Sequence, residues 1–276
     1  MTIPPRRVCV SMPNDLYWHD QSVIISGASS GIGRAVAERL GRCGARVGLI
    51  ARRGGLLVAL TDEIRSRGGR AAYAAADVTV AREVLAAVER LEAELGPCDV
   101  ALAAAGIYRM TDVARLDAAA SAAVVTTNVG GVMNLFAAVV PGMIERRSGR
   151  LAAVASIGAM LGLPGGAAYC ASKAAVVTMM ESLRIDLDRY GIKVTTLCPG
   201  FVDTPMVTNA ERAAGGLMSA DEAARRIVWA VERGRAEYWF PWRTWALARI
   251  GRALPHGWYR RVINHFEPMA EVLGDQ

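Results

Sequence analysis

The pair Tyr169 and Lys173 has the residue types and the spacing that point most directly to chemistry. Residues four apart share one face of a helix, so the phenol and the ammonium can converge on one site. A cation beside a phenol favours the phenolate and lowers the phenol pKa from about 10 toward working pH, where a general acid or base is most effective. Unless this is an ordinary surface helix, the pair predicts proton exchange with a substrate oxygen.

A glycine cluster at 27–33 lies between an expected strand and an expected helix. Ser22–Ser26 is a short apolar run typical of a buried strand, and apolar residues then recur at helical spacing up to Leu40, before a second strand at Ala45–Ala51. Glycines permit a tight turn close to a pyrophosphate, and the helix N-terminus offers unpaired N–H groups. The spacing Gly-x-x-x-Gly-x-Gly differs from Gly-x-Gly-x-x-Gly and from the phosphate-loop ATPase motif, and it predicts binding of nucleotide phosphates.

The rest of the chain alternates short apolar runs with helical stretches, as in a parallel sheet covered on both faces. Further strands are expected at Val100–Ala105, Leu151–Ala155 and Lys193–Cys198. The 276 residues contain no Pro/Ser-rich linker and no repeat, so we expect a single α/β domain with a doubly wound parallel sheet. Five cysteines without a Cys-x-x-Cys pair, and three histidines outside every motif, predict a reducing compartment and no metal site.

From Ser22 to Pro205 the sequence resembles the short-chain dehydrogenases/reductases. The phosphate loop is similar to the cofactor loop of that family, with Ser26 where a Thr usually opens it. Asn128 and Ser156 lie at the spacings of the family's catalytic Asn and Ser, so with the Tyr and Lys pair all four positions of the tetrad are filled. The resemblance implies a Rossmann-like fold and the nicotinamide-dependent interconversion of a carbonyl compound and an alcohol.

The resemblance also implies a set of cofactor contacts. One segment departs from the family pattern: Ala103-Ala104-Ala105-Gly106 lies where the family usually has Asn-Asn-Ala-Gly, so two amides beside the adenosine half are missing. Asp77 and Val78 resemble the pair that contacts the adenine. The expected contacts are Gly27, Ser29, Ser30, Gly31, Ile32, Gly33, Asp77, Val78, Ala105, Gly106, Tyr169, Lys173, Pro199, Gly200, Val202 and Thr204.

By the same resemblance each tetrad residue has a role. Tyr169 exchanges the proton with the substrate oxygen, Ser156 forms a hydrogen bond to that oxygen, and Lys173 tunes Tyr169 and holds the nicotinamide ribose. The amide of Asn128 would hold a water that connects Lys173 to solvent. Taken singly, Ser156 and Asn128 are better explained as a turn residue and a helix-interior amide, whereas the full set favours catalysis.

The end of the second strand bears on the choice of cofactor. An acidic side chain there would bind the ribose hydroxyls of NAD and repel a 2′-phosphate, but the chain has Arg52 and Arg53 instead. Guanidinium groups suit bidentate contact with phosphate, and Arg52 is the stronger of the two candidates, unless both are solvated loop residues. The sequence therefore predicts a preference for NADP(H), with NAD(H) possible.

The substrate pocket is expected to be apolar, because hydrophobic residues follow the catalytic positions. This predicts an apolar ketone, aldehyde or alcohol as the substrate. Two alternatives stay open: reduction of a 3-oxoacyl thioester, with arginines meeting an acidic carrier, and a nicotinamide-nucleotide sensor without turnover. The expected substrate contacts are Ser156, Tyr108, Met160, Leu163 and Met206.

A C-terminal arm, residues 235–276, follows the core expected at about 20–234. Residues 225–266 contain nine Arg and two Glu, a net charge of +7, so with a chain total of +6 the rest sums to −1. Tryptophans and tyrosines are interleaved with the arginines, and an apolar arc runs along a helix expected from Trp242 to Leu254. The arm is a lid over the substrate, a subunit contact or an interfacial membrane helix, and no groove-reading motif indicates nucleic-acid binding.

Two uncharged stretches, Ala118–Ile144 and Leu151–Ser172, are long enough to span a membrane. Their Asn, Pro and Gly content suits buried elements of a soluble protein. Met1–Gln21 lacks the apolar run of a signal peptide, so we expect a cytoplasmic protein, with peripheral membrane contact through the arm open. The family resemblance implies a homodimer or homotetramer formed through the helices that carry Asn128 and Tyr169.

Overall fold

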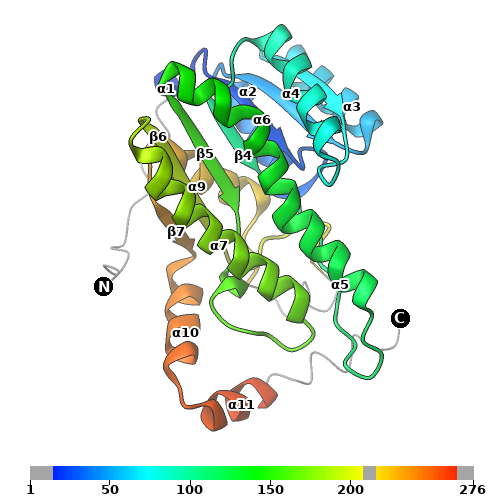
Figure 1. Ribbon diagram of the computed structural model, residues 1–276, viewed down its shortest axis with the longest axis vertical. Coiled ribbons are helices and arrows are strands. Elements are labelled where there is room, and N and C mark those ends of the chain that lie inside the picture. Colours follow the sequence, from blue (N-terminus) through cyan, green and yellow to red (C-terminus); the bar gives the residue numbers. More distant parts are fainter. Residues whose placement is uncertain (1–14, 208–215, 266–276) are drawn as a thin grey trace.

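A seven-stranded sheet organises the computed structural model, which describes residues 15–207 and 216–265 (Figure 1). The strand order is β3-β2-β1-β4-β5-β6-β7, and every neighbouring pair is parallel. The strands are β1 Ser22–Ser26, β2 Arg46–Ala51, β3 Arg70–Ala75, β4 Val100–Ala103, β5 Gly149–Val154, β6 Ile192–Pro199 and β7 Glu237–Phe240.

Helices cover both faces of the sheet (Figure 1). They are α1 Asp15–Trp18, α2 Gly31–Arg42, α3 Gly54–Ser66, α4 Ala81–Leu95, α5 Ala118–Val125, α6 Gly131–Arg146, α7 Ala167–Asp188, α9 Ala220–Glu232, α10 Trp242–Ala253 and α11 His256–His265. A π-helical turn, Thr126–Gly130, joins α5 to α6, and a 3-10 turn, Ile157–Ala159, follows β5. One hydrophobic core lies between the sheet and α2, α3 and α9, and the other between the sheet and α4, α6 and α7. The doubly wound α/β architecture is therefore confirmed.

The strands form where the sequence has unbroken apolar runs, because their side chains enter both cores. In β1, Val23 and Ile25 lie in one core and Ile24 lies in the other. The predicted strand at Val100–Ala105 ends two residues early, at Ala103. The chain leaves the sheet there and passes against Gly27, where a Cβ atom would lie 2.5 Å from the backbone N of Ala105.

Strand order reverses between β1 and β4, which are neighbours in the sheet although β2 and β3 separate them in the chain. The connections from β1 and β4 therefore leave toward opposite sides and open a crevice at the carboxyl ends of these strands. Ligands of open α/β sheets bind in such crevices. This point in the sheet is where the glycine cluster of the sequence lies.

The sheet extends further along the chain than the core boundary expected at about residue 234. Glu237–Phe240 forms β7 and pairs in parallel with β6, from Thr196 opposite Glu237 to Pro199 opposite Phe240. Phe240 is 1% exposed, and the Tyr238 ring stacks on it with centroids 5.0 Å apart. This aromatic strand was not predicted, because arginines surround it in the sequence. The part of the arm outside the sheet consists of α10 and α11.

One helical stretch of the described residues, Ala118–Arg146, is long and apolar enough to cross a membrane by length and composition. Only 39% of its most apolar window is buried, but α6 packs on the sheet and Asn128 is fully buried within the stretch. Core helices of soluble proteins pass the same test, so it is weak evidence for a span. The other uncharged stretch divides into β5, the 3-10 turn and the start of α7.

Candidate active site

A cavity of about 830 Å³ lies at the carboxyl ends of the central strands. All sixteen residues expected from the family resemblance to contact the cofactor line it, as do Arg52 and Arg53. Three members of the expected tetrad, Ser156, Tyr169 and Lys173, line the same cavity. The structure thus brings together residues from seven separate segments of the chain.

The glycine loop allows close backbone contacts that no side chain would permit. Gly27 has φ of +73°, and a Cβ atom on Gly33 would lie 2.5 Å from the carbonyl oxygen of Gly27. The backbone of the loop can therefore lie against a bound ligand. Helix α2 begins at Gly31, and the residues of its first turn, whose N–H groups have no partner within the helix, line the cavity. A nucleotide pyrophosphate fits this arrangement.

Two guanidinium groups lie at one end of the cavity and make different contacts. Arg53 Nη2 donates hydrogen bonds of 2.8 Å to Ser29 Oγ and to Ser30 Oγ, across the glycine loop. Arg52 lies 3.8 Å from Asp77 Oδ2, and its side chain is 70% exposed. The Arg52 fork is thus accessible from the cavity, whereas the Arg53 fork is engaged with the loop.

Asp77 stays ionised at this end of the cavity. Hydrogen bonds of 2.9 Å from the backbone N and from Oγ1 of Thr79 reach Asp77 Oδ1. These bonds, the backbone one above all, lower the pKa of the Asp77 carboxyl despite partial burial. The ionised carboxylate can accept a hydrogen bond from an amine of a bound nucleobase.

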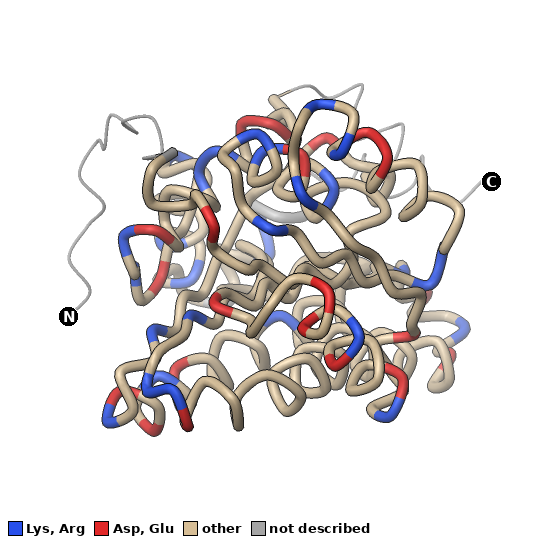
Figure 2. Tube along the Cα trace, turned by 90° about the horizontal axis from the view of Figure 1, so that it is seen from above, with Lys and Arg blue, Asp and Glu red and all other residues tan. Residues whose placement is uncertain are grey.

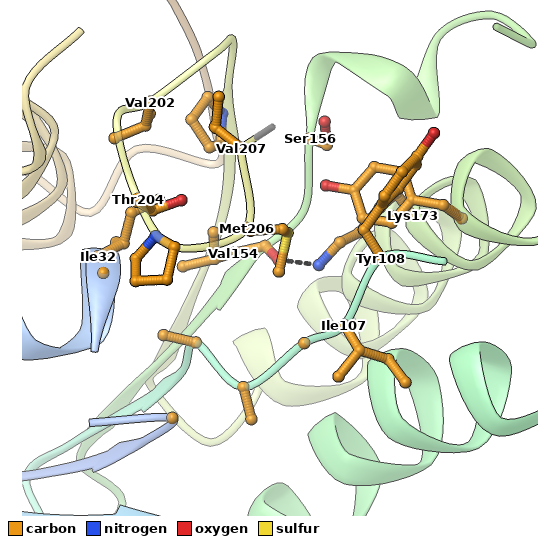
Figure 3. A pocket seen from close by; sticks show the side chains of 18 of the residues that line it. Ile32, Ile107, Tyr108, Val154, Ser156, Lys173, Val202, Thr204, Met206 and Val207 are labelled. Carbon is orange, nitrogen blue, oxygen red and sulfur yellow. Dashed lines mark hydrogen bonds between the residues drawn. The ribbon is translucent and has the colours of Figure 1, made fainter. Parts of the chain in front are cut away.

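The tetrad lysine is buried beneath the tyrosine. Lys173 Nζ donates a 2.8 Å hydrogen bond to the carbonyl oxygen of Val154 and lies 5.7 Å from the centroid of the Tyr169 ring (Figure 3). Burial lowers the pKa of Lys173 to about 8. At this distance, a change in the charge of Lys173 would change the pKa of the Tyr169 phenol.

Ser156, Tyr108 and Lys173 lie on one side of the cavity, and Thr204 and Val202 lie on the other (Figure 3). Ser156 Oγ accepts a 3.1 Å hydrogen bond from the backbone N of Gly158, which orients the hydroxyl at the end of β5. The Tyr108 ring packs edge-on against Tyr169, with centroids 5.2 Å apart. Ser156, Tyr169 and Lys173 thus form one cluster.

Asn128 is buried in the π-helical turn and does not line the cavity. Its Nδ2 donates 3.0 Å hydrogen bonds to Ile107 O and Ser172 Oγ, and its Oδ1 accepts a 2.8 Å bond from Ile107 N. Ser172 Oγ in turn donates to the backbone oxygen of Tyr169. Both N–H groups are used, so the side chain ties the segment after β4 to α7, and only its Oδ1 could still bind a water, as an acceptor. The π-helical turn and the backbone partners left no signal in the sequence.

The other end of the cavity is apolar. Tyr108, Leu163 and Met206 line it as expected, but Met160 does not. Met160 closes the 3-10 turn, which presents Ile157 and Gly158 to the cavity in its place. Sequence reasoning missed Met110, an apolar residue two positions after Tyr108. Further apolar lining residues are Ile157, Pro164, Phe201, Val207 and Leu217.

Neither a reactive thiol nor a metal site accompanies this cluster in the described part of the chain. Burial raises the pKa of the Cys170 thiol, which disfavours the thiolate and agrees with a packing role. Within residues 15–207 and 216–265, no group of three or more His, Cys, Asp or Glu side chains could hold a metal ion. Cys9 lies outside the described residues.

The C-terminal arm touches two segments that border the cavity. A Cβ atom on Gly200 would lie 3.2 Å from Pro241 Cδ and 3.6 Å from Thr244 Cγ2, so the start of α10 packs on the segment after β6. Tyr259, in α11, donates a hydrogen bond to the carbonyl oxygen of Gly162. The arm thus braces the loops at the apolar end.

Comparisons with known proteins agree with this geometry. The family model described as short chain dehydrogenase matches residues 21–215. An uncharacterized oxidoreductase of Myxococcus xanthus is 38% identical over 86% of this chain and 93% of its own length. A putative ketoacyl reductase of Streptomyces coelicolor is 37% identical over 77% of this chain and 83% of its own.

Solved structures give the same result. A variant of actinorhodin polyketide ketoreductase with NADPH superposes with a TM-score of 0.73 at 31% identity, covering 79% of this chain and 94% of that one. A dehydrogenase/reductase of Sinorhizobium meliloti gives a TM-score of 0.73 at 26% identity, covering 80% and 93%. The chain belongs to the short-chain dehydrogenase family and is an NAD(P)-dependent oxidoreductase.

Proposed function

We propose that this protein interconverts an apolar ketone or aldehyde and its alcohol with a preference for NADP(H). One observation carries the proposal: a single cavity holds the Ser156, Tyr169 and Lys173 cluster among apolar side chains and has two arginines beside its glycine loop. The glycine loop would hold the pyrophosphate, and Lys173 would hold the nicotinamide ribose. When bound, the cofactor supplies or accepts the hydride.

The protein side chains transfer the proton and stabilise the charge that develops on the substrate oxygen. In reduction, the hydroxyl of Tyr169 donates its proton to the substrate oxygen, and in oxidation the phenolate removes it. The hydroxyl of Ser156 forms a hydrogen bond to that oxygen and stabilises negative charge on it. The ammonium of Lys173 favours the phenolate form of Tyr169. Asn128 acts as a positioning residue, because its contacts reach the Ile107 segment and α7.

The preference for NADP(H) is supported by the guanidinium groups at the end of β2. A 2′-phosphate at this end would meet Arg52, which is exposed and only loosely paired with Asp77. Charge-assisted hydrogen bonds to phosphate are stronger than those to neutral hydroxyls. The actinorhodin ketoreductase structure contains NADPH, which agrees with this proposal.

A second candidate, reduction of a 3-oxoacyl thioester, is favoured by the name of the Streptomyces relative, a putative ketoacyl reductase. In that case the arginines of the arm would meet the acidic surface of an acyl carrier. A panel of apolar ketones beside 3-oxoacyl thioesters separates the candidates by kcat/KM. Much higher values for short hydrophilic carbonyls would contradict both.

The decisive test of catalysis is Tyr169→Phe. We expect turnover to fall by about 100-fold to 10,000-fold, the usual contribution of a general acid or base. NADPH affinity, measured by fluorescence titration, should stay close to that of the wild type, because the ring remains. A nicotinamide-binding sensor without turnover would keep its output in this variant, which distinguishes the two classes.

We also propose that the protein works in the cytoplasm as a homodimer or homotetramer. The family resemblance supports the assembly, and Val125 and Met133, on the helical stretch that carries Asn128, are 44% and 46% exposed. Sedimentation velocity of the purified protein tests this proposal. A monomer at micromolar concentration would contradict it.

A further inference from the structure

Helix α10 is inverted relative to an ordinary amphipathic helix. Such a helix turns its large apolar residues toward the core. Here the small residues Thr244 and Gly251 lie beside Gly200 and Leu161 of the body, and of the large apolar residues only Trp245 is half-buried. The large residues Leu247 and Ile250 are 68% and 60% exposed.

The next helix continues this exposed apolar surface. In α11, Tyr259 faces the body through its hydrogen bond to Gly162, whereas Trp258 is 63% exposed. Trp242, at the start of α10, is 47% exposed. Both helices project from the β7 end of the sheet, away from the cores (Figure 1). We call Trp242, Leu247, Ile250 and Trp258 the apolar arm surface.

The charge around the apolar arm surface has one sign. From 241 to 265 the sequence contains five Arg and no Asp or Glu. Arg243 lies over the Trp242 ring and Arg249 over the Trp245 ring, at 5.9 and 5.4 Å from the centroids. Elsewhere acidic and basic residues are interspersed along the trace (Figure 2). Exposed Trp and Leu beside arginine suit the headgroup depth of a bilayer, where basic residues are attracted to anionic lipids.

We propose that the apolar arm surface docks on a bilayer that contains anionic lipids. A second copy of the arm would bring five more arginines against the first five, and like charges would repel. Outside residues 225–266 the chain has a net charge of only −1, so the body of another copy carries little overall charge to attract the arm. A lipid surface satisfies both the charge and the exposed apolar residues.

Docking would place the apolar end of the cavity beside the bilayer. The inner side of the arm contacts Gly200, which lines the cavity, and Leu161 and Gly162, which precede the lining residue Leu163. An apolar carbonyl compound dissolved in the lipid would then enter without crossing much water. This consequence rests on the proposed function, whereas the docking itself does not.

Vesicle co-sedimentation tests the docking and needs no turnover. The wild-type protein is mixed with phosphatidylcholine vesicles and with vesicles that contain about one third phosphatidylglycerol. Each is measured at about 0.01 M and about 1 M salt, where the Debye length is about 30 and 3 Å. We expect binding to the anionic vesicles at low salt and its loss at high salt. The double variant Leu247→Glu/Ile250→Glu should lower the bound fraction by about tenfold or more.

Matched controls separate docking from a general change in charge. Leu85, 47% exposed on α4, and Arg82, on the same helix, lie far from the arm in sequence. Leu85→Glu and Arg82→Glu should bind vesicles like the wild type, whereas Arg252→Glu should bind several-fold less. NADPH affinity should be equal in all variants, which shows that each is folded.

Three outcomes would overturn the proposal. The first is a wild-type protein that stays in the supernatant with both kinds of vesicle. The second is equal binding by the wild type and the double variant. The third is a change of oligomeric state in the double variant, seen by sedimentation velocity, without any change in vesicle binding. That result would assign the apolar arm surface to a second copy of the chain.

Discussion

The two ends of the cavity are built in different ways. At the cofactor end, the backbone itself approaches the ligand site, and Gly27 and Gly33 leave no room for a Cβ atom. At the substrate end, side chains such as Leu163 and Met206 stand on loops that the arm braces from outside. The first end tolerates almost no change of residue type, whereas the second can change its lining while the fold stays the same. The glycine motif is therefore concentrated at the cofactor end, and we propose that the lining of the other end selects the substrate.

The sharpest way to break this comparison is Gly27→Ala. The new Cβ atom would lie 2.5 Å from the backbone N of Ala105, and φ of +73° adds strain. We expect the free energy of unfolding to fall by about 3 to 5 kcal/mol, measured by urea denaturation. Gly55→Ala, in α3, is the control, because the added Cβ atom would meet no other part of the molecule within 4 Å. This variant should be neutral or more stable than the wild type by less than about 1 kcal/mol. Equal effects would contradict the role of backbone contact.

The buried lysine sharpens the comparison through pH. Its pKa is lowered from 10.5 to about 8 by burial, so between these values the unfolded chain binds a proton that the folded protein lacks. The contribution of Lys173 to the free energy of unfolding should therefore rise with pH across this window, by about 3 kcal/mol in total, and be constant below it.

Chemical denaturation from pH 7 to pH 10 measures this as the difference between the wild type and Lys173→Met. Lys193, the other lysine of the chain, has a side chain that is 54% exposed and serves as the control. Lys193→Met is measured over the same pH range and controls for the loss of a lysine side chain that is not buried. A flat difference for Lys173→Met would show that Lys173 is hydrated in the folded protein.

Arg52 and Arg53 should differ in their effect on the preference for NADPH over NADH. Arg52→Ala should weaken NADPH binding about tenfold to 100-fold and leave NADH binding unchanged, because its exposed fork is the one that can reach a 2′-phosphate. Arg53→Ala should weaken both cofactors by about tenfold, because Arg53 holds Ser29 and Ser30 of the glycine loop. Fluorescence titration with both cofactors tests this. A loss of discrimination in Arg53→Ala alone would reverse the assignment.

The smallest expected effect concerns the substrate end. Tyr259→Phe removes one hydrogen bond to Gly162, worth about 1 kcal/mol. We expect KM for a bulky apolar ketone to change about fivefold, with kcat and NADPH affinity unchanged, since the bond braces only a loop. Tyr73→Phe, on β3, is the matched control. A fall in kcat for Tyr259→Phe would place the arm in catalysis and break the comparison.

Much of this architecture could be predicted from the sequence. Periodicity predicted β1 to its residues, and the helix from Trp242 was expected within one residue of its observed end. These elements have strong local signals, because a buried strand needs an unbroken apolar run and an amphipathic helix needs a repeat of 3.6 residues. The glycine loop was recognisable for the same reason: local backbone geometry requires the glycines.

Features that depend on distant contacts were not predictable. β7 was missed because its neighbours are arginines and its four residues are held by pairing with β6. The contacts of Asn128 were missed because two of its three bonds go to the backbone of Ile107, which any residue type could provide. Met160 was misplaced because a 3-10 turn, and not the order of residues, decides which side chain faces the cavity.

The π-helical turn at Thr126–Gly130 has a consequence for how the length of this chain can change in evolution. A π-helical turn accommodates one residue more than a regular helix would. Loss of one residue would close the turn into regular α-helix, so α5 and α6 would keep their orientation but the backbone around Asn128 would change. Asn128 would then lose its bonds to Ile107 and Ser172. Deletions here should therefore be purged even when every catalytic residue is kept, so active enzymes descended from this chain should retain the extra residue.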